Sequence, residues 1–133
     1  MRNLLAFDLG ASNGRAILGQ FDGEKLTMRE LHRFENNYIE MNGVFYWDLP
    51  YLYNQLKQGL LAFKNANVGT LDCIGIDTWG VDYGLLDERG RLLSDPVNYR
   101  DERTAGVMEK AFAVVPEEEI YRRTGLARRC TGR

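Results

Sequence analysis

The chain has 133 residues, of which 44% are hydrophobic and 27% are charged, a balance typical of a folded globular domain rather than a disordered segment. Its formal net charge of -2 provides no overall basic field, which argues against nucleic acid or an anionic membrane surface as a partner. No apolar run approaches the roughly 18 residues of a membrane span, and no stretch is long enough for the core of a signal peptide, so we expect a cytoplasmic protein.

The first third of the chain predicts three strands in a meander. Residues 3–10 form a short, nearly continuous apolar run, typical of a central strand that is buried on both faces. Residues 15–21 and 25–34 predict the next two strands, and the Asp22-Gly23 pair between them is a strong hairpin signal.

A helix and a parallel strand are expected next. A polar, Asn-rich connection leads to Asp48, which can cap a helix whose apolar residues recur at steps of three and four as far as Phe63. The helix should end in the break at residues 65–69. Residues 71–77 then predict a strand, reached by a crossover long enough to bring it parallel to the first. This order predicts an α/β fold with a mixed sheet.

The remaining segments are shorter. Residues 81–93, with a polar turn at 87–90, predict a second hairpin. Residues 103–114 and 117–123 predict helices, and the acidic residues that open the second one are interpreted as capping groups. Residues 1–125 are therefore expected to form the folded part. Residues 126–133, which contain three arginines, are expected to be a disordered tail outside it.

Neither the two cysteines nor the single histidine indicates a metal, redox or catalytic site. Cys73 lies in an apolar run and is predicted to be a small buried thiol. Cys130 lies in the tail, and the two cysteines match no metal-ligand or redox spacing. His32 shares a predicted strand face with Glu30, so a solvated side chain is favoured over a catalytic role.

The stretch that is most informative about function is residues 8–15, with the sequence DLGASNGR. It places the Asp8 carboxylate at the end of a buried strand and small residues in a tight turn between two strands. Gly10 and Gly14 can adopt backbone angles closed to other residues, so that successive N–H groups point at phosphate oxygens. Asp8 would face the metal that accompanies the phosphates. An ordinary hairpin turn is the alternative, while the spacing excludes P-loop and dinucleotide-binding motifs.

A glycine-rich turn between antiparallel strands resembles the first phosphate loop of the actin-like ATPases, a ribonuclease H-like fold that includes hexokinase-type sugar kinases. Two further segments narrow the resemblance to the FGGY carbohydrate kinases. Residues 74–87 (IGIDTWGVDYGLLD) resemble the rhamnulokinase version of that family's second strand motif. Residues 96–104 (PVNYRDERT) carry the aromatic residue and polar, Arg-bearing segment usual in the family. The resemblance covers residues 2–125.

The resemblance implies part of an actin-like half-domain from a kinase that uses ATP and Mg²⁺ to phosphorylate L-rhamnulose. Position by position, it implies an ATP site formed by Ala11, Ser12, Asn13, Gly14 and Arg15. It also implies that Asp8 faces the magnesium and that Gly80 contacts the sugar. Trp79 and Tyr99 would form walls of the sugar pocket, with core aromatic positions as the alternative.

Several interpretations stay open. Asp77 and Asp82 either bind sugar hydroxyls or cap a turn, and capping is favoured. The family's general base is an Asp much further along, so no catalytic residue is assigned here, and the isolated chain is expected to be inactive. We interpret the change near Leu126 as a truncation or reading-frame shift.

A half-domain of this kind is also expected to self-associate through uncovered surfaces. Its small-molecule partners would be the sugar and ATP. The alternatives are another FGGY kinase, such as a fuculokinase or xylulokinase, and a non-catalytic module that binds a nucleotide or a sugar.

Overall fold

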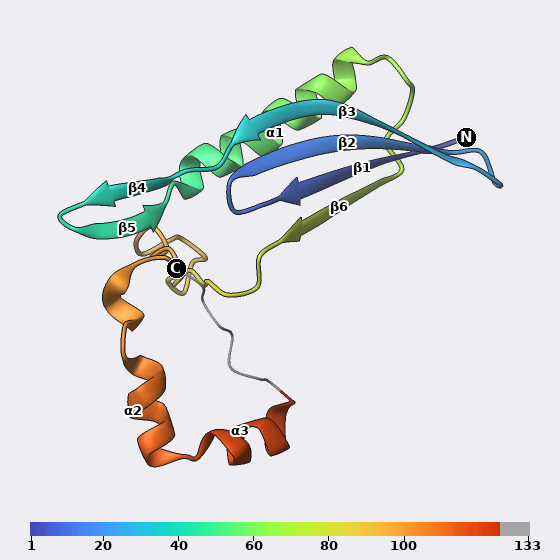
Figure 1. Cartoon of the computed structure of the whole chain (residues 1–133). Helices are drawn as coiled ribbons and strands as arrows, with labels where there is room; N and C mark the ends of the chain where they lie inside the picture. The colour runs from blue at the N-terminus through green and yellow to red at the C-terminus, as the bar shows by residue number, and fades with distance from the viewer. Residues whose placement is uncertain (126–133) are drawn as a thin grey trace. The chain divides into compact units, whose positions relative to one another are not determined.

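The computed structural model describes residues 1–125 and contains two compact units, Met1–Arg100 and a second that begins at Asp101. Each unit is described by itself. The elements of the first unit are, in chain order, β1 (Arg2–Leu9), β2 (Asn13–Phe21), β3 (Leu26–Glu35), β4 (Tyr38–Met41), β5 (Val44–Trp47), α1 (Leu49–Asn65) and β6 (Cys73–Thr78) (Figure 1).

Four of these strands form a mixed sheet in the order β3-β2-β1-β6. β1 pairs antiparallel with β2, and β2 pairs antiparallel with β3, which confirms the predicted meander. β6 returns parallel to β1, with Leu9 beside Thr78 at the end of the ladder. The predicted α/β fold with a mixed sheet is therefore confirmed.

The core of the first unit lies between the sheet and α1, which runs along one face of the strands (Figure 1). The helix begins where the sequence predicts, because Asp48 Oδ1 accepts the N–H of Tyr51 at 2.8 Å. Gly59 allows α1 to approach the sheet, since a Cβ there would lie 2.4 Å from Phe7 Cε1. The buried cluster consists of Leu5, Phe7, Ala16, Leu18 and Phe63.

The predicted burial of β1 on both faces is wrong for the described part of the chain. Leu4 is half-buried and Ala6 is exposed on the face opposite α1. Cys73, predicted to be buried, is exposed, because it pairs with Leu4 and side chains paired across parallel strands share a face. α1 packs against only the other side of the sheet.

The connection before α1 is a hairpin rather than the predicted polar loop. β4 and β5 pair antiparallel, with Met41 opposite Val44. The two residues between them, Asn42 and Gly43, have φ angles of 53° and 77°. Positive φ at both positions is the geometry of a type I′ turn, for which Asn-Gly is the preferred pair.

The prediction of a solvated His32 is also wrong. The register of β3 against β2 shifts by one residue, so that Glu30 pairs with Ile17 and His32 pairs with Ala16. A bulge breaks the alternation of faces that the prediction assumed. His32 is half-buried, with its Nε2 2.7 Å from Gln55 Oε1 on α1.

The second predicted hairpin is present as a single antiparallel bridge between Leu86 and Leu92, supported by the bond from Leu93 N to Leu85 O at 2.9 Å. It forms no regular strands. Asp87 organises its turn, and hydrogen bonds from the backbone and side chain of Arg91 hold the pKa of that carboxyl below its ordinary value.

The second unit contains a 3-10 helix, η1 (Glu102–Thr104), followed by α2 (Val107–Val114) and α3 (Glu117–Thr124). The predicted helix over 103–114 is interrupted at Gly106, whose φ is 72°. No side chain caps α3, so the acidic residues lie in its first turn without the capping bond we expected. Arg122 and Arg123 instead pair with Glu119 and lower its pKa.

The predicted tail at 126–133 lies outside the described residues. Within the described part, every helix is too short or too polar to cross a membrane.

Candidate functional site

The turn between β1 and β2, residues 10–12, is the predicted phosphate loop, and hydrogen bonds fix it from two sides. Gly10 N donates to Asn13 O at 2.9 Å, which closes the turn. Asn36, just after β3, donates its backbone N–H to Ser12 O at 3.0 Å and its side-chain amide to Gly10 O at 2.7 Å. Asn36 is 2% exposed. Asn36 was not predicted from the sequence, because its partners lie more than 20 positions earlier.

Gly10 and Gly14 allow close packing around the loop and do not adopt the unusual backbone angles that we expected. Neither Gly10 nor Gly14 is among the described glycines with positive φ. A Cβ on Gly14 would lie 2.1 Å from Phe34 Cζ, and a Cβ on Gly10 would lie 2.9 Å from Asn13 O. Both distances are too short for a Cβ atom to occupy. Glycine at these two positions therefore lets Phe34 of β3 pack against Gly14 and lets the turn form at Gly10.

Asp8 and Arg15, which the sequence predicts to contact magnesium and ATP, lie at the strand ends that flank the loop. Arg15 forms an ion pair with Asp8, whose side chain is 40% exposed. Asp77 is the in-register neighbour of Asp8 on β6, and side chains paired across parallel strands share a face. Two carboxylates and a guanidinium therefore lie at the same end of the sheet.

The side chain of Asn13 is held from β3. Arg33 Nη1 donates to Asn13 Oδ1 at 3.2 Å, while the same guanidinium pairs with Glu30 at 2.6 Å. This pairing raises the pKa of Arg33 and lowers the pKa of Glu30. A guanidinium that is paired with Glu30 therefore lies beside the side chain of Asn13.

The predicted sugar-side residues lie in the irregular segments that follow β6. The ring of Trp79 lies against that of Trp47, the last residue of β5, with ring centroids 4.2 Å apart and planes tilted by 34°. Tyr99 lies 6.3 Å from Trp47 on the same measure. We call Trp47, Trp79 and Tyr99 the aromatic cluster. Trp79 and Tyr99 were predicted from the sequence, whereas Trp47 was not, although the aromatic run after Asn42-Gly43 was a signal for it.

Asp82 joins the members of the aromatic cluster. Its Oδ2 accepts the indole N–H of Trp47 at 2.6 Å and that of Trp79 at 3.0 Å. The backbone N–H of Tyr99 also approaches this oxygen, at 3.3 Å. The carboxylate therefore links three segments of the chain, a role that neither of the two interpretations drawn from sequence had included.

Gly80 is exposed, and it is not among the residues that line the neighbouring cavity. A Cβ on Gly80 would meet nothing within 4 Å, so the described chain itself does not require glycine there. Trp47, Trp79 and Asp82 contribute to the lining of a cavity of about 150 Å³.

The predicted phosphate loop and the predicted sugar-binding residues Trp79 and Gly80 follow the ends of two adjacent strands. β1 and β6 are parallel and end in register at Leu9 and Thr78. The phosphate loop follows Leu9 directly, and Trp79-Gly80 follow Thr78 directly. Neighbouring strands are about 4.8 Å apart, so the two predicted half-sites begin side by side. Loops beyond the carboxyl ends of parallel strands are a common place for ligand sites in α/β proteins.

Residues 3–130 match the FGGY family of carbohydrate kinases, N-terminal domain. The chain belongs to this family. It is 48% identical over 126 residues to a rhamnulokinase of Mannheimia succiniciproducens and 45% identical over 126 residues to a rhamnulokinase of Halalkalibacterium halodurans. The alignments cover 93% and 95% of this chain but only 26% and 27% of those proteins. This FGGY chain therefore spans about a quarter of the length of these curated relatives.

Solved structures agree on the fold. A ligand-bound xylulose kinase from Lactobacillus acidophilus matches with a TM-score of 0.75 at 15% identity, covering 94% of this chain and 25% of that one. A glycerol kinase from Plasmodium falciparum with ADP matches with a TM-score of 0.68 at 20% identity, covering 96% of this chain and 26% of that one. The actin-like ATPase fold implied by the resemblance is confirmed.

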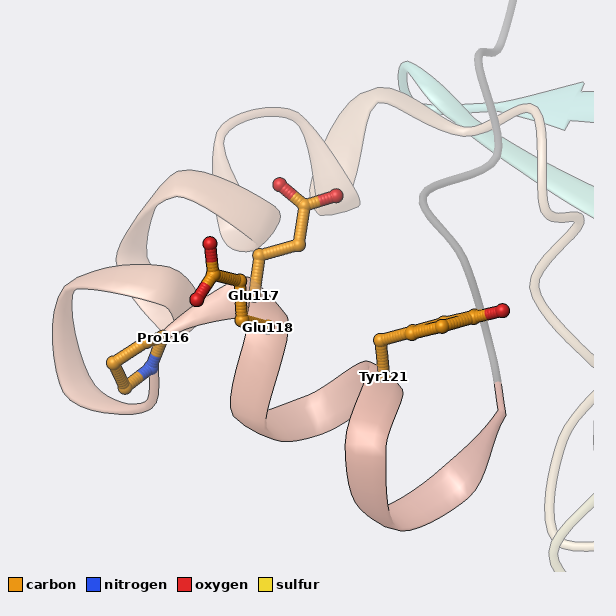
Figure 2. A pocket seen from close by; sticks show the side chains of 4 residues that line it. All are labelled: Pro116, Glu117, Glu118 and Tyr121. Atoms are coloured by element: carbon orange, nitrogen blue, oxygen red, sulfur yellow. The ribbon is translucent and has the colours of Figure 1, made fainter.

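The second unit of this FGGY chain has a hollow of its own, of about 620 Å³, lined by Pro116, Glu117, Glu118 and Tyr121. Figure 2 shows these side chains around the first turns of α3. The lining contains none of the residues that the sequence predicts for ATP, magnesium or sugar. The candidate site is thus the end of the sheet in the first unit.

Proposed function

We propose that this chain supplies the phosphate loop and part of the sugar pocket of a kinase that transfers the γ-phosphoryl group of ATP to L-rhamnulose, giving L-rhamnulose 1-phosphate in rhamnose breakdown. The observation that carries the proposal is that the phosphate loop and Trp79-Gly80 directly follow the paired strand-end residues Leu9 and Thr78. The two relatives named rhamnulokinase, at 48% and 45% identity, support the choice of sugar.

On the nucleotide side, the proposal assigns the phosphates to the turn and the start of β2. Backbone N–H groups in a tight turn form a concave site for anions, and side-chain amides and hydroxyls add hydrogen bonds. Arg15 would alternate between Asp8 and a phosphate oxygen. The residues assigned to ATP are Ala11, Ser12, Asn13, Gly14 and Arg15.

The carboxylates at this end fit a magnesium ion. Mg²⁺ prefers oxygen ligands and is commonly held by one or two carboxylates together with substrate phosphates. Asp8, with Asp77 beside it on the same face, offers that donor set. The ion would neutralise charge on the phosphates during transfer.

On the sugar side, the proposal assigns Gly80 and Trp79 to the sugar, with Tyr99 as a second wall. Sugar C–H faces pack on aromatic rings, while the hydroxyls need polar partners. The open space at Gly80 admits a hydroxyl close to the backbone.

In the proposed reaction a hydroxyl oxygen of the sugar attacks the γ-phosphorus, a new O–P bond forms, and the bond to the β,γ-bridging oxygen of ATP breaks to release ADP. The hydroxyl proton passes to a general base. We assign that base to an Asp outside these 133 residues, as the resemblance implies. The isolated chain would then bind ligands without turning them over.

Isothermal titration of the purified chain with L-rhamnulose and with Mg-ATP, together with a coupled assay for ADP, tests this proposal. We expect heat from each ligand and no ADP. Tighter binding of L-fuculose or D-xylulose than of L-rhamnulose would change the sugar assigned to the site. Absence of binding to every ketose and to Mg-ATP would contradict the proposal. ADP release that depends on rhamnulose would place the base within the chain.

We also propose that the chain works in the cytoplasm, where ATP is available, and that the isolated chain self-associates. Ile74 and Ile76 on the edge strand β6 are 48% and 59% exposed. An edge strand with exposed apolar side chains is a template for pairing with another chain. Sedimentation at two protein concentrations measures this.

A further inference from the structure

We propose that Asp82 is a positioning residue for the sugar pocket, holding Trp47, Trp79 and the backbone of Tyr99 in the arrangement that receives the sugar. This inference deepens the proposed function and rests on it for the identity of the ligand. Asp82 acts through the rings and does not take part in phosphoryl transfer.

The geometry around Asp82 concentrates three donors on one oxygen. The indole N–H groups of Trp47 and Trp79 lie 2.6 Å and 3.0 Å from Oδ2, and the N–H of Tyr99 lies 3.3 Å from it. Hydrogen bonds to a charged acceptor are about twice as strong as neutral ones. Trp47 is 35 residues from Asp82 in sequence, so the contact joins separate parts of the fold.

The rings differ in how firmly the main chain holds them. Trp47 is 2% exposed, and its backbone N–H donates to Pro96 O at 2.8 Å. Its strand neighbour Tyr46 bridges to Val97. Trp47 is thus fixed by backbone pairing as well as by its side chain.

Trp79 and Tyr99 lie on irregular backbone, and Tyr99 is 39% exposed. The hydrogen bond to Asp82 and the contact with the Trp47 ring hold the Trp79 ring in its orientation. Since a sugar face must pack flat on a ring to gain from it, the angle of Trp79 decides how well the pocket works.

Spectroscopy can observe this arrangement directly, because Trp47 and Trp79 are the two tryptophans of the whole chain. Their rings are close enough for coupled near-ultraviolet circular dichroism, and their emission depends on the indole N–H environment. The experiment compares the full chain with the variants Asp82→Ala and Asp82→Asn. Asp87→Asn is the matched control, because Asp87 lies five positions later and binds Arg91 rather than the aromatic cluster.

Each variant is recorded without ligand and then titrated with L-rhamnulose and with Mg-ATP. Without ligand, we expect Asp82→Ala to lose the coupled tryptophan signal and to shift its emission to the red. Its affinity for L-rhamnulose should fall by about tenfold, as expected when a charged hydrogen bond no longer orders the site. Its affinity for Mg-ATP and its far-ultraviolet spectrum should not change, and Asp87→Asn should match the parent chain throughout.

Asp82→Asn keeps the shape of the side chain and one acceptor oxygen but loses the charge. We expect an intermediate spectrum and an intermediate rhamnulose affinity. This variant decides the test if Asp82→Ala proves to be unfolded in the far-ultraviolet spectrum.

Two results would overturn the inference. One is a ligand-free tryptophan spectrum that Asp82→Ala and Asp82→Asn leave unchanged. The other is an altered spectrum with the parent affinity for L-rhamnulose. If the parent chain binds no sugar, the proposed function fails on that result alone, and the inference falls with it as a statement about a sugar pocket, while the ligand-free spectra still decide whether Asp82 orients the rings.

Discussion

The phosphate loop and the aromatic cluster lie at the same end of the sheet but are held in different ways. The loop joins two paired strands, is clamped by Asn36, and has Gly14 packed under the ring of Phe34. In the cluster, Trp47 ends strand β5 while Trp79 and Tyr99 lie on irregular backbone, and the Asp82 carboxylate joins all three. Changes at the loop should therefore act mainly on the stability of the fold, and changes at the cluster mainly on ligand binding.

Gly14→Ala should have the largest effect on stability. The new Cβ would lie 2.1 Å from Phe34 Cζ, and overpacking of this kind lowers the free energy of unfolding by about 3 kcal/mol. Urea denaturation followed by circular dichroism measures the change. Gly75→Ala is the matched control, because a Cβ on that strand glycine meets nothing within 4 Å. Equal stability of the two variants would contradict the packing explanation.

Asn36→Ala should rank second. It removes the donor to Gly10 O and leaves a carbonyl without that partner, at a cost of about 2 kcal/mol in the free energy of unfolding. The loosened loop should also bind Mg-ATP more weakly in calorimetric titration. The adjacent exposed Asn37→Ala serves as the control. Parent-like affinity for Mg-ATP in Asn36→Ala would mean that the clamp does not shape the phosphate site.

Trp47→Phe should have a smaller effect on stability, about 1.5 kcal/mol, because a smaller aromatic ring still fills most of the site while one N–H bond to a charged acceptor is lost. Binding of L-rhamnulose should weaken while binding of Mg-ATP stays the same. Denaturation and the two titrations measure both effects. A loss of Mg-ATP affinity as large as the loss for sugar would show that the two regions are not independent.

Gly80→Ala should have the smallest effect on stability, within about 0.5 kcal/mol, because the site is open and exposed. We expect weaker binding of L-rhamnulose, since the added methyl group fills the space assigned to the sugar. Titration of this variant beside Gly75→Ala separates a pocket effect from a general effect of replacing glycine. Unchanged rhamnulose affinity would remove Gly80 from the proposed site.

Local signals in the sequence were enough for most of the elements. The Asp22-Gly23 pair, the Asp48 cap and the apolar periodicity of the following helix each act within a few residues, so they predict the meander and α1 without knowledge of the rest. The β4–β5 hairpin was readable in the same way from Asn42-Gly43 and was overlooked. The motifs at residues 8–15, 74–87 and 96–104 together indicated the FGGY family, which the match over residues 3–130 confirmed.

Tertiary structure alone decided the contacts that define the candidate site. The bond from Asn36 to Gly10, the ring of Phe34 over Gly14 and the convergence of two tryptophans on Asp82 join segments that are distant in sequence. Such contacts depend on strand register and on which faces are covered, and a single bulge in β3 changes both. Composition and periodicity specify each element, whereas packing between elements determines which side chains meet.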